Sequence, residues 1–269
     1  MLLKDKVVIV TGASKGLGVG IAEVCAREGA RVVLAARSKD RLLELRRRIE
    51  GAGGKALAVP CDVSHMPDLE RLVSETVRVF GALHGLVNNA GVNFVKPFLE
   101  VTEAEWDHVL DVDLKGSFFL SQLCARQMLA QGTGGSIVQI ASVHTYASVA
   151  GASPYDAAKH GMVGFSKAAA IELAKQRVRV NVLSPGLCNT EIWKALIDAA
   201  PSEAECRAYW HANIPAERLI EPGEIADACV FLLSDRSACI TGANLMADLG
   251  VTSQLVSKEP YRSKEIVGQ

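Results

Sequence analysis

The chain has 269 residues, of which 49% are hydrophobic, and its 29 basic and 30 acidic residues leave a formal net charge of −1. This composition is typical of a globular α/β domain and excludes a disordered chain. Charges form no long block, so neither nucleic acid nor a membrane surface is expected as a partner. No apolar run reaches the roughly 18 residues of a spanning helix.

The N-terminus and the cysteines point to an intracellular protein. The first ten residues run directly into an apolar segment and leave no room for a signal peptide. The seven cysteines are scattered, odd in number and without a CxxC pair. This pattern predicts reduced, packed thiols and neither a disulfide framework nor a metal site. We therefore expect a cytoplasmic location.

Short β-branched runs alternate with longer helical patterns along the chain. The predicted strands are 6–10, 31–35, 56–59, 83–87, 136–140, 178–183 and 243–246. The predicted helices are 17–28, 39–50, 68–80, 103–130, 155–175 and 223–233. Strand–helix alternation predicts parallel strands with right-handed crossovers, and continuous apolar strands predict helices on both faces. The expected fold is therefore a single-domain, doubly wound, Rossmann-like parallel sheet of about seven strands.

The predicted domain occupies residues 1–250. Its longest insertion between regular elements, 187–220, is expected to be a substrate loop, because long loops in compact domains are often lids. Residues 251–269 form a polar C-terminal tail that is either loose or docked on a neighbouring subunit.

The first strand leads into TGASKGLG (11–18), a glycine turn that opens a helix. Gly12 permits the tight turn, Gly16 lets the backbone approach a pyrophosphate, and Gly18 lets the helix lie close to the sheet. The free N–H groups of the helix start would bind the phosphates, with Ser14 and Leu17 in the same turn. The alternative to a dinucleotide site is an ordinary βα turn. The segment is not a Walker motif, because no GK[ST] follows.

The end of the second predicted strand bears on coenzyme choice. A site that selects NAD usually has an acidic residue there, whereas this chain has Ala36 followed by Arg37. With Lys15 in the glycine turn, two cations favour the 2′-phosphate of NADP(H) over NAD(H). The alternative is that both are solvated surface charges.

Two later strand ends are also expected to contact the coenzyme. CDV (61–63) would place Asp62 and Val63 beside the adenine. NNAG (88–91) would let a flat backbone, with Asn89, Ala90 and Gly91, pass the coenzyme.

These segments resemble the short-chain dehydrogenase/reductase family. The resemblance rests on TGASKGLG, CDV, NNAG, Ser142 after the fifth strand, YDAAK (155–159), PGLCNT (185–190) and ITGANLMADLG (240–250), in the family's order from about residue 5 to 250. It implies a nicotinamide coenzyme, contacts from Pro185, Gly186 and Thr190, and a catalytic site of Ser142, Tyr155 and Lys159. It also implies a homo-oligomer, with a tetramer favoured.

Tyr155 and Lys159 stand one helical turn apart on the same face. A phenol ordinarily releases its proton near pH ~10, so a tyrosine that acts as a base near neutrality needs a nearby cation. Lys159 would supply that cation and hold the nicotinamide ribose, while Ser142 would orient the substrate oxygen. Tyr155 would then give or take the proton as hydride moves.

One position departs from the family pattern. The segment WDHVLDVDLKG (106–116) has Asp113 where the family normally carries an asparagine that supports a water chain behind the lysine. An ionised Asp113 accepts hydrogen bonds but cannot donate them, so the charge state of a relay would change.

The candidate substrate residues lie around and beyond the catalytic serine. They are Asn93, Ser142, His144, Tyr146, Tyr155, Leu187, Cys188, Trp193 and Trp210. His144 would hydrogen-bond a substrate hydroxyl, or else it only packs or meets solvent. Trp193 and Trp210 would line a lid, or else they are buried anchors or subunit contacts.

The expected function is hydride transfer between NADP(H) or NAD(H) and a carbonyl/secondary-alcohol pair, with no metal. The expected substrate is small and polar: a sugar, a polyol or a keto ester. One alternative is a 3-oxoacyl-carrier-protein reductase, which needs a basic surface of the kind suggested by Arg126, Lys167 and Arg177. The other is a non-catalytic dinucleotide-binding sensor.

Overall fold

Seven parallel strands form one sheet in the order β3-β2-β1-β4-β5-β6-β7 in the computed structural model, which describes residues 1–254. The strands are β1 Val7–Thr11, β2 Arg31–Ala36, β3 Lys55–Pro60, β4 Gly85–Asn88, β5 Gly135–Ile140, β6 Val178–Pro185 and β7 Asn244–Ala247. The predicted doubly wound parallel sheet is confirmed.

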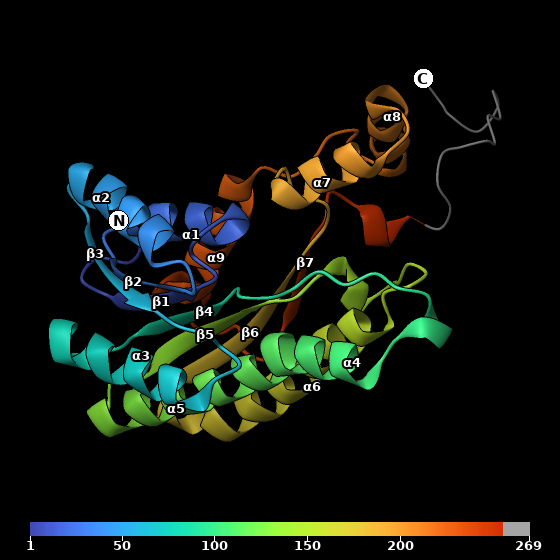
Figure 1. Ribbon diagram of the computed structural model, residues 1–269. Coiled ribbons are helices and arrows are strands. Elements are labelled where there is room, and N and C mark those ends of the chain that lie inside the picture. Colours follow the sequence, from blue (N-terminus) through green and yellow to red (C-terminus); the bar gives the residue numbers. More distant parts are fainter. Residues whose placement is uncertain (255–269) are drawn as a thin grey trace.

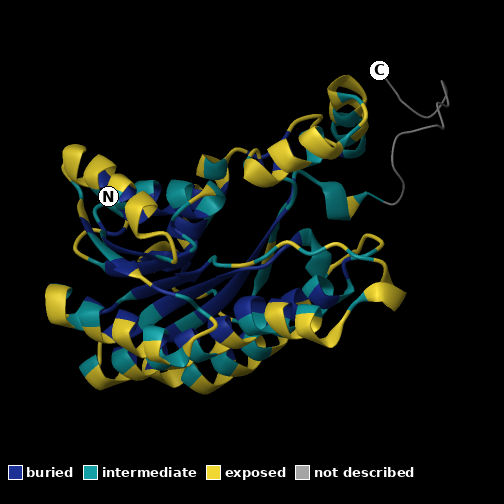
Figure 2. Ribbon diagram, in the orientation of Figure 1, coloured by how far each residue is buried: buried dark blue, intermediate teal, exposed yellow. Residues whose placement is uncertain are grey.

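Helices cover both faces of this sheet (Figure 1). One face carries α1 Gly16–Arg27, α2 Lys39–Gly51 and α9 Pro222–Leu233. The other carries α3 Met66–Phe80, α4 Glu103–Leu110, α5 Gly116–Gln131 and α6 Ser153–Leu173. Figure 2 shows the strands buried between helices whose outer surfaces are exposed, which explains why the strands are apolar on both faces.

The strand order reverses between β1 and β4, which are direct neighbours with Val10 paired to Val87. The loops that follow these two strands therefore diverge to opposite faces of the sheet and leave a crevice at its carboxyl edge. The glycine turn at 11–18 and the NNAG segment at 88–91 both lie at this edge.

The helix predicted over 103–130 is interrupted. A capping box of Thr102 and Glu105 starts α4, but residues Asp111–Lys115 form a π-helical turn before α5 begins. The backbone carbonyl of Asp113 accepts a 3.0 Å hydrogen bond from the Ser117 hydroxyl. A π-turn contains one residue more than an α-turn, and such turns are frequent at functional sites.

A buried polar network lies between the sheet and the first turns of α5. The Asn88 amide nitrogen donates to the Ser117 carbonyl (3.1 Å), the Ser121 hydroxyl (3.0 Å) and the Gln139 side-chain carbonyl (2.9 Å). Gln139 donates to Ser121 at 2.8 Å, and Ser121 donates to the Ser117 carbonyl at 2.7 Å. The network thereby fixes α5, and the π-turn before it, against β4 and β5.

The insertion at 187–220 contains two helices, α7 Glu191–Ala199 and α8 Glu203–Asn213. They form a small apolar cluster of their own around Trp193, Ile214 and Leu219. In Figure 1 they lie beyond the carboxyl edge of the sheet. Residues 251–253 of the predicted tail form a 3₁₀ turn, and the tail beyond residue 254 lies outside the described residues.

Within residues 1–254, no helix has the length and apolar character needed to cross a membrane.

We predict that Asn88→Ala destabilises the protein by about 3 kcal/mol, because it leaves the Gln139 carbonyl buried without its donor. Urea unfolding would measure the change. The matched control is Asn213→Ala, since within residues 1–254 the Asn213 amide donates only to the Tyr209 carbonyl, at the surface of α8. The control should change the free energy of unfolding by about 0.5 kcal/mol or less. Equal losses in the two variants would contradict a role for the network.

Candidate active site

The glycine turn has the conformation that dinucleotide binding requires. Gly12 and Gly16 have φ of +66° and +54°, a region that side chains disfavour. A Cβ on Gly18 would lie 2.3 Å from the Gly12 carbonyl oxygen, so only glycine fits there. The first turn of α1 receives no side-chain cap from Lys15, which leaves its N–H groups available to an anion. These residues fit a pyrophosphate.

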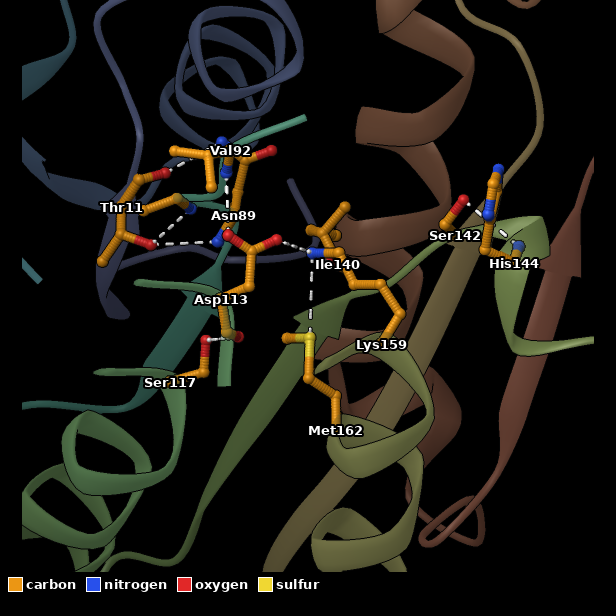
Figure 3. Close-up of polar contacts among 11 residues, drawn as sticks. Thr11, Asn89, Val92, Asp113, Ser117, Ile140, Ser142, His144, Lys159 and Met162 are labelled. Atoms are coloured by element: carbon orange, nitrogen blue, oxygen red, sulfur yellow. Dashed lines mark hydrogen bonds and ion pairs between the residues drawn. The ribbon is translucent and has the colours of Figure 1, made fainter. Parts of the chain in front are cut away.

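The turn is tied to the segment after β4. The Thr11 hydroxyl accepts hydrogen bonds from the backbone N–H groups of Asn89 (2.9 Å) and Ala90 (3.0 Å). In return, the Asn89 amide donates to the Thr11 carbonyl at 2.9 Å (Figure 3). The two edges of the crevice are thus held at a fixed separation, and the predicted residues 89–91 lie beside the glycine turn.

An open cleft runs from the glycine turn to α2 and α7. Ser14, Lys15, Arg41 and Thr190 are among the residues that line it. The Thr190 side chain also lies 3.6 Å from the position of a Cβ on Gly16. The predicted coenzyme residues from both ends of the chain therefore meet here. Arg41 was not singled out from the sequence, because a cation on an amphipathic helix has no distinguishing local signal.

Two cations, Lys15 and Arg41, line this cleft, and a third, Arg37, directly follows β2. Lys15, Arg37 and Arg41 are all exposed. Asp62 accepts hydrogen bonds from Ser64 at 2.7 and 3.0 Å, and these bonds, with the charge of Arg37, hold its pKa below the ordinary value. Arg37 and Asp62 are therefore close enough for their charges to interact.

The remaining predicted coenzyme residues serve the packing around the crevice. Leu17 and Val63 pack against the two cores on opposite faces of the sheet. Pro185 ends β6, and the Gly186 N–H donates to the Ala247 carbonyl at 3.0 Å.

Lys159 and Asp113 form a buried ion pair. The Lys159 Nζ lies 3.2 Å from Asp113 Oδ2, and the two side chains are 5% and 0% exposed. Nζ also donates to the Ile140 carbonyl at 3.3 Å, and Asp113 Oδ1 accepts from the Val92 N–H at 2.8 Å (Figure 3). Oδ2 is fully buried, and the Lys159 ammonium is its partner in the ion pair.

The pair sets the protonation state of the lysine. Burial acts to lower the pKa of Lys159, but the Asp113 and Tyr155 charges together outweigh it and leave the pKa above its ordinary value. Lys159 is therefore an ammonium throughout the neutral range, although it is almost fully enclosed.

Tyr155 lies against this ammonium and against His144. The Lys159 Nζ is 5.3 Å from the centre of the tyrosine ring. The His144 ring meets the same ring edge to face, with 5.2 Å between centroids. The three predicted residues Tyr155, Lys159 and His144 are thus brought together.

Ser142 begins the 3₁₀ turn that follows β5. Its hydroxyl accepts from the His144 N–H at 3.3 Å, and Figure 3 shows the two residues side by side. The turn is fastened to the neighbouring strands, because the Thr145 hydroxyl lies 3.1 Å from the Ser184 hydroxyl and accepts from the Asn244 amide at 3.0 Å. The turn that carries Ser142 is therefore tied to β5, β6 and β7.

The other candidate substrate residues are spread around the mouth of the crevice. Trp193 is 2% exposed and packs inside the α7–α8 cluster, with Arg207 over its ring at 5.6 Å. Leu187 and Trp210 pack against the same cluster, whereas Asn93 and Tyr146 are exposed. Burial, with help from nearby glutamates, raises the pKa of the Cys188 thiol to about 12. Trp193 is thus a buried anchor in this conformation, and its substrate contact stays a prediction.

Known proteins share both the sequence and the fold of this chain. A sequence family described as enoyl-(acyl carrier protein) reductase matches residues 12–252. The L-rhamnose 1-dehydrogenase (NAD(P)(+)) of Azotobacter vinelandii is 37% identical over 255 residues, which cover 93% of this chain and 98% of that protein.

Two solved structures superpose closely. A short-chain type dehydrogenase/reductase from Mycobacterium marinum is 33% identical, with a TM-score of 0.87, and the match covers 94% of this chain and 97% of that one. A variant of actinorhodin polyketide ketoreductase with NADPH is 32% identical, with a TM-score of 0.89, and the match covers 93% and 98% of the two chains.

We predict that Asp113→Asn remains active and shifts the alkaline limb of its oxidation pH–rate profile to lower pH. The amide can still accept from the Val92 N–H, but it removes a negative charge that opposes formation of the phenolate. Asp113→Ala should lose more activity, because it leaves that N–H unpaired and the Lys159 charge uncompensated. Profiles of both variants beside the parent are the test, and three superimposable profiles would contradict a role for Asp113.

Proposed function

Because the chain belongs to the short-chain dehydrogenase/reductase family, we propose that its crevice binds a nicotinamide dinucleotide and that Ser142, Tyr155 and Lys159 act on the substrate. The enzyme is an oxidoreductase acting on CH–OH or carbonyl groups. The single observation that carries the assignment of roles is the convergence of Tyr155 and the buried Lys159–Asp113 pair at the crevice.

The residues of the crevice fit the coenzyme. The glycine turn and the uncapped start of α1 would hold the pyrophosphate, and residues 89–91 would lie along the nicotinamide half. Asp62 and Val63 follow β3 and would flank the adenine. When bound, the nicotinamide accepts or donates the hydride.

The chain's own residues would handle the proton. Ser142 donates a hydrogen bond to the substrate oxygen and orients it toward the Tyr155 hydroxyl. Tyr155 protonates that oxygen during reduction and deprotonates it during oxidation. The Lys159 ammonium, 5.3 Å from the tyrosine ring centre, favours the phenolate, and Asp113 holds the ammonium in place.

We propose a small polar substrate such as a sugar, a polyol or a keto ester. The similarity to an L-rhamnose 1-dehydrogenase supports a sugar. Polar groups near Tyr155 also support it, since the His144 ring contacts Tyr155 and the His144 backbone N–H bonds the Ser142 hydroxyl.

A carrier-protein ketoreductase is the second candidate, and the similarity to a polyketide ketoreductase favours it. The basic surface that it needs is less well placed. Arg126, Lys167 and Arg177 are exposed, but Arg177 immediately precedes β6 and so lies at the amino edge of the sheet, opposite Ser142. We therefore rank this candidate below a small polar substrate.

We also propose a cytoplasmic homotetramer that prefers NADP(H). Exposed apolar side chains on α4, α5 and α6, including Trp106, Phe118 and Ile171, support subunit contacts along these helices. Most of the cysteines are buried free thiols, in keeping with a reducing compartment.

We predict that Tyr155→Phe lowers turnover by about 10³-fold or more and leaves NADPH binding unchanged, because the ring still packs but has no transferable proton. The assay follows NAD(P)H absorbance with a panel of alcohols and carbonyl compounds, and coenzyme fluorescence measures binding. The control is Tyr209→Phe, which removes a hydroxyl from a side chain that is 62% exposed. Turnover by Tyr155→Phe at the rate of the parent would refute the assignment.

We predict a preference for NADP(H) that arises from Arg37, Lys15 and Arg41. The double variant Ala36→Asp with Arg37→Ala should reverse the preference, since it exchanges a cation for a carboxylate at the end of β2. Arg41→Ala should weaken the binding of NADPH and leave the binding of NADH unchanged. Titration with NADPH and NADH gives the dissociation constants, and equal or tighter NADPH binding by the double variant would contradict the proposal.

A further inference from the structure

His144 is held by a chain of side chains that the roles above do not use. Its Nδ1 lies 2.5 Å from Asp156 Oδ1, and the Ser148 hydroxyl donates to Asp156 Oδ2. The His144 and Asp156 side chains are only 20% and 16% exposed. Ser148 and His144 belong to the segment after β5, whereas Asp156 belongs to α6.

This arrangement fixes which nitrogen faces the carboxylate. Asp156 lies in the first turn of α6, where the helix dipole favours a negative charge. An ionised carboxylate only accepts hydrogen bonds, so Nδ1 must carry a proton. Neutral His144 then has a lone pair at Nε2. No hydrogen bond to Nε2 occurs among residues 1–254, so this acceptor is available to a ligand.

His144 also contacts the two groups that would hold the reacting oxygen, its ring with Tyr155 and its backbone with Ser142. Its ring stands edge to face on Tyr155 at 5.2 Å, and its backbone N–H donates to the Ser142 hydroxyl (Figure 3). A substrate oxygen bound by Ser142 and Tyr155 therefore lies next to His144. A second polar group within one or two carbons of the reacting carbon would come within its reach.

We propose that His144 is a specificity-determining residue that accepts a hydrogen bond from a second hydroxyl of the substrate, and that Asp156 and Ser148 are positioning residues that hold it. This inference rests on the proposed function. It narrows the substrate class to a carbinol or carbonyl with a neighbouring hydroxyl, such as an aldose or an α-hydroxy ketone. A site built to bind such a hydroxyl discriminates against the analogue that lacks it.

A purely structural role would have a different signature. If His144 only anchored its loop to α6, the Nδ1 contact alone would matter. His144→Asn places an amide near the position of Nδ1 and keeps the contact with Asp156, whereas His144→Gln places one near Nε2. The two variants therefore separate anchoring from substrate recognition.

The test uses the full chain and pairs of substrates that differ by one hydroxyl. The pairs are L-rhamnose with 2-deoxy-L-rhamnose for oxidation, and acetoin with butan-2-one for reduction. For the hydroxylated member of the pair that the parent turns over, we expect His144→Ala and His144→Asn to lower kcat/KM about tenfold, mainly through KM. The deoxy member should change little, and His144→Gln should recover part of the loss.

Asp156→Asn and Ser148→Ala test the positioning roles. Both should raise KM for the hydroxylated member, Asp156→Asn more strongly, because an amide no longer fixes the tautomer of His144. His160→Ala is the matched control, since the ring of this exposed histidine hydrogen-bonds the backbone carbonyl of Asp156 at 2.9 Å and, among residues 1–254, no side chain. It should leave both members unchanged.

Three outcomes would overturn the inference. Equal losses for both members of a pair, or full rescue by His144→Asn but not by His144→Gln, would show that His144 only anchors the loop, and the oxidoreductase assignment would stand. A parent enzyme that binds NADPH but turns over neither pair would overturn the inference as well. The proposed function would fail only if the wider panel of alcohols and carbonyl compounds also gave no turnover.

Discussion

The ion pair of Lys159 and Asp113 is the constraint on which the catalytic end of the molecule depends. Both charges are almost fully enclosed, and removing one partner from such a pair typically costs about 3–5 kcal/mol. Since the pKa of Lys159 lies above its ordinary value of 10.5, the stabilisation is complete at neutral pH. It is lost only as the pH rises through the folded-state value. An ammonium can thus be kept beside Tyr155 without contact with bulk water.

The rest of the site is arranged around this pair. Asp113 receives the Val92 N–H just beyond the NNAG segment, and Lys159 reaches the carbonyl at the end of β5. Asn88 and its hydrogen-bond partners fix the first turns of α5 against β4 and β5. The crevice, α6 and the sheet therefore share one set of contacts, and a displacement of any of them would move the Lys159 ammonium.

Much of this could be predicted from the sequence. The seven strands are continuous apolar runs because the sheet is covered on both faces, and Gly18 is required because a side chain would meet the carbonyl of Gly12. Contacts between distant segments could not be predicted. Asp156 and Ser148 become partners of His144 only when a loop folds back on α6, and Asn88 has no local signal of a buried network.

The π-turn was also beyond sequence reasoning, because an apolar pattern interrupted by one extra residue still reads as a single helix over 103–130. Its consequence follows from the number of residues in the turn. Every residue after Lys115 is rotated by about 100° relative to an unbroken α-helix, given 3.6 residues per turn. The extra residue is taken up within the turn that carries Asp113, so α4 and α5 keep their faces toward the fold. A deletion of one residue there would close the π-turn and leave Leu120, Cys124 and Met128 in the core, but it would displace Asp113. The position of the acid is thus encoded in the length of the segment as much as in the identity of any side chain.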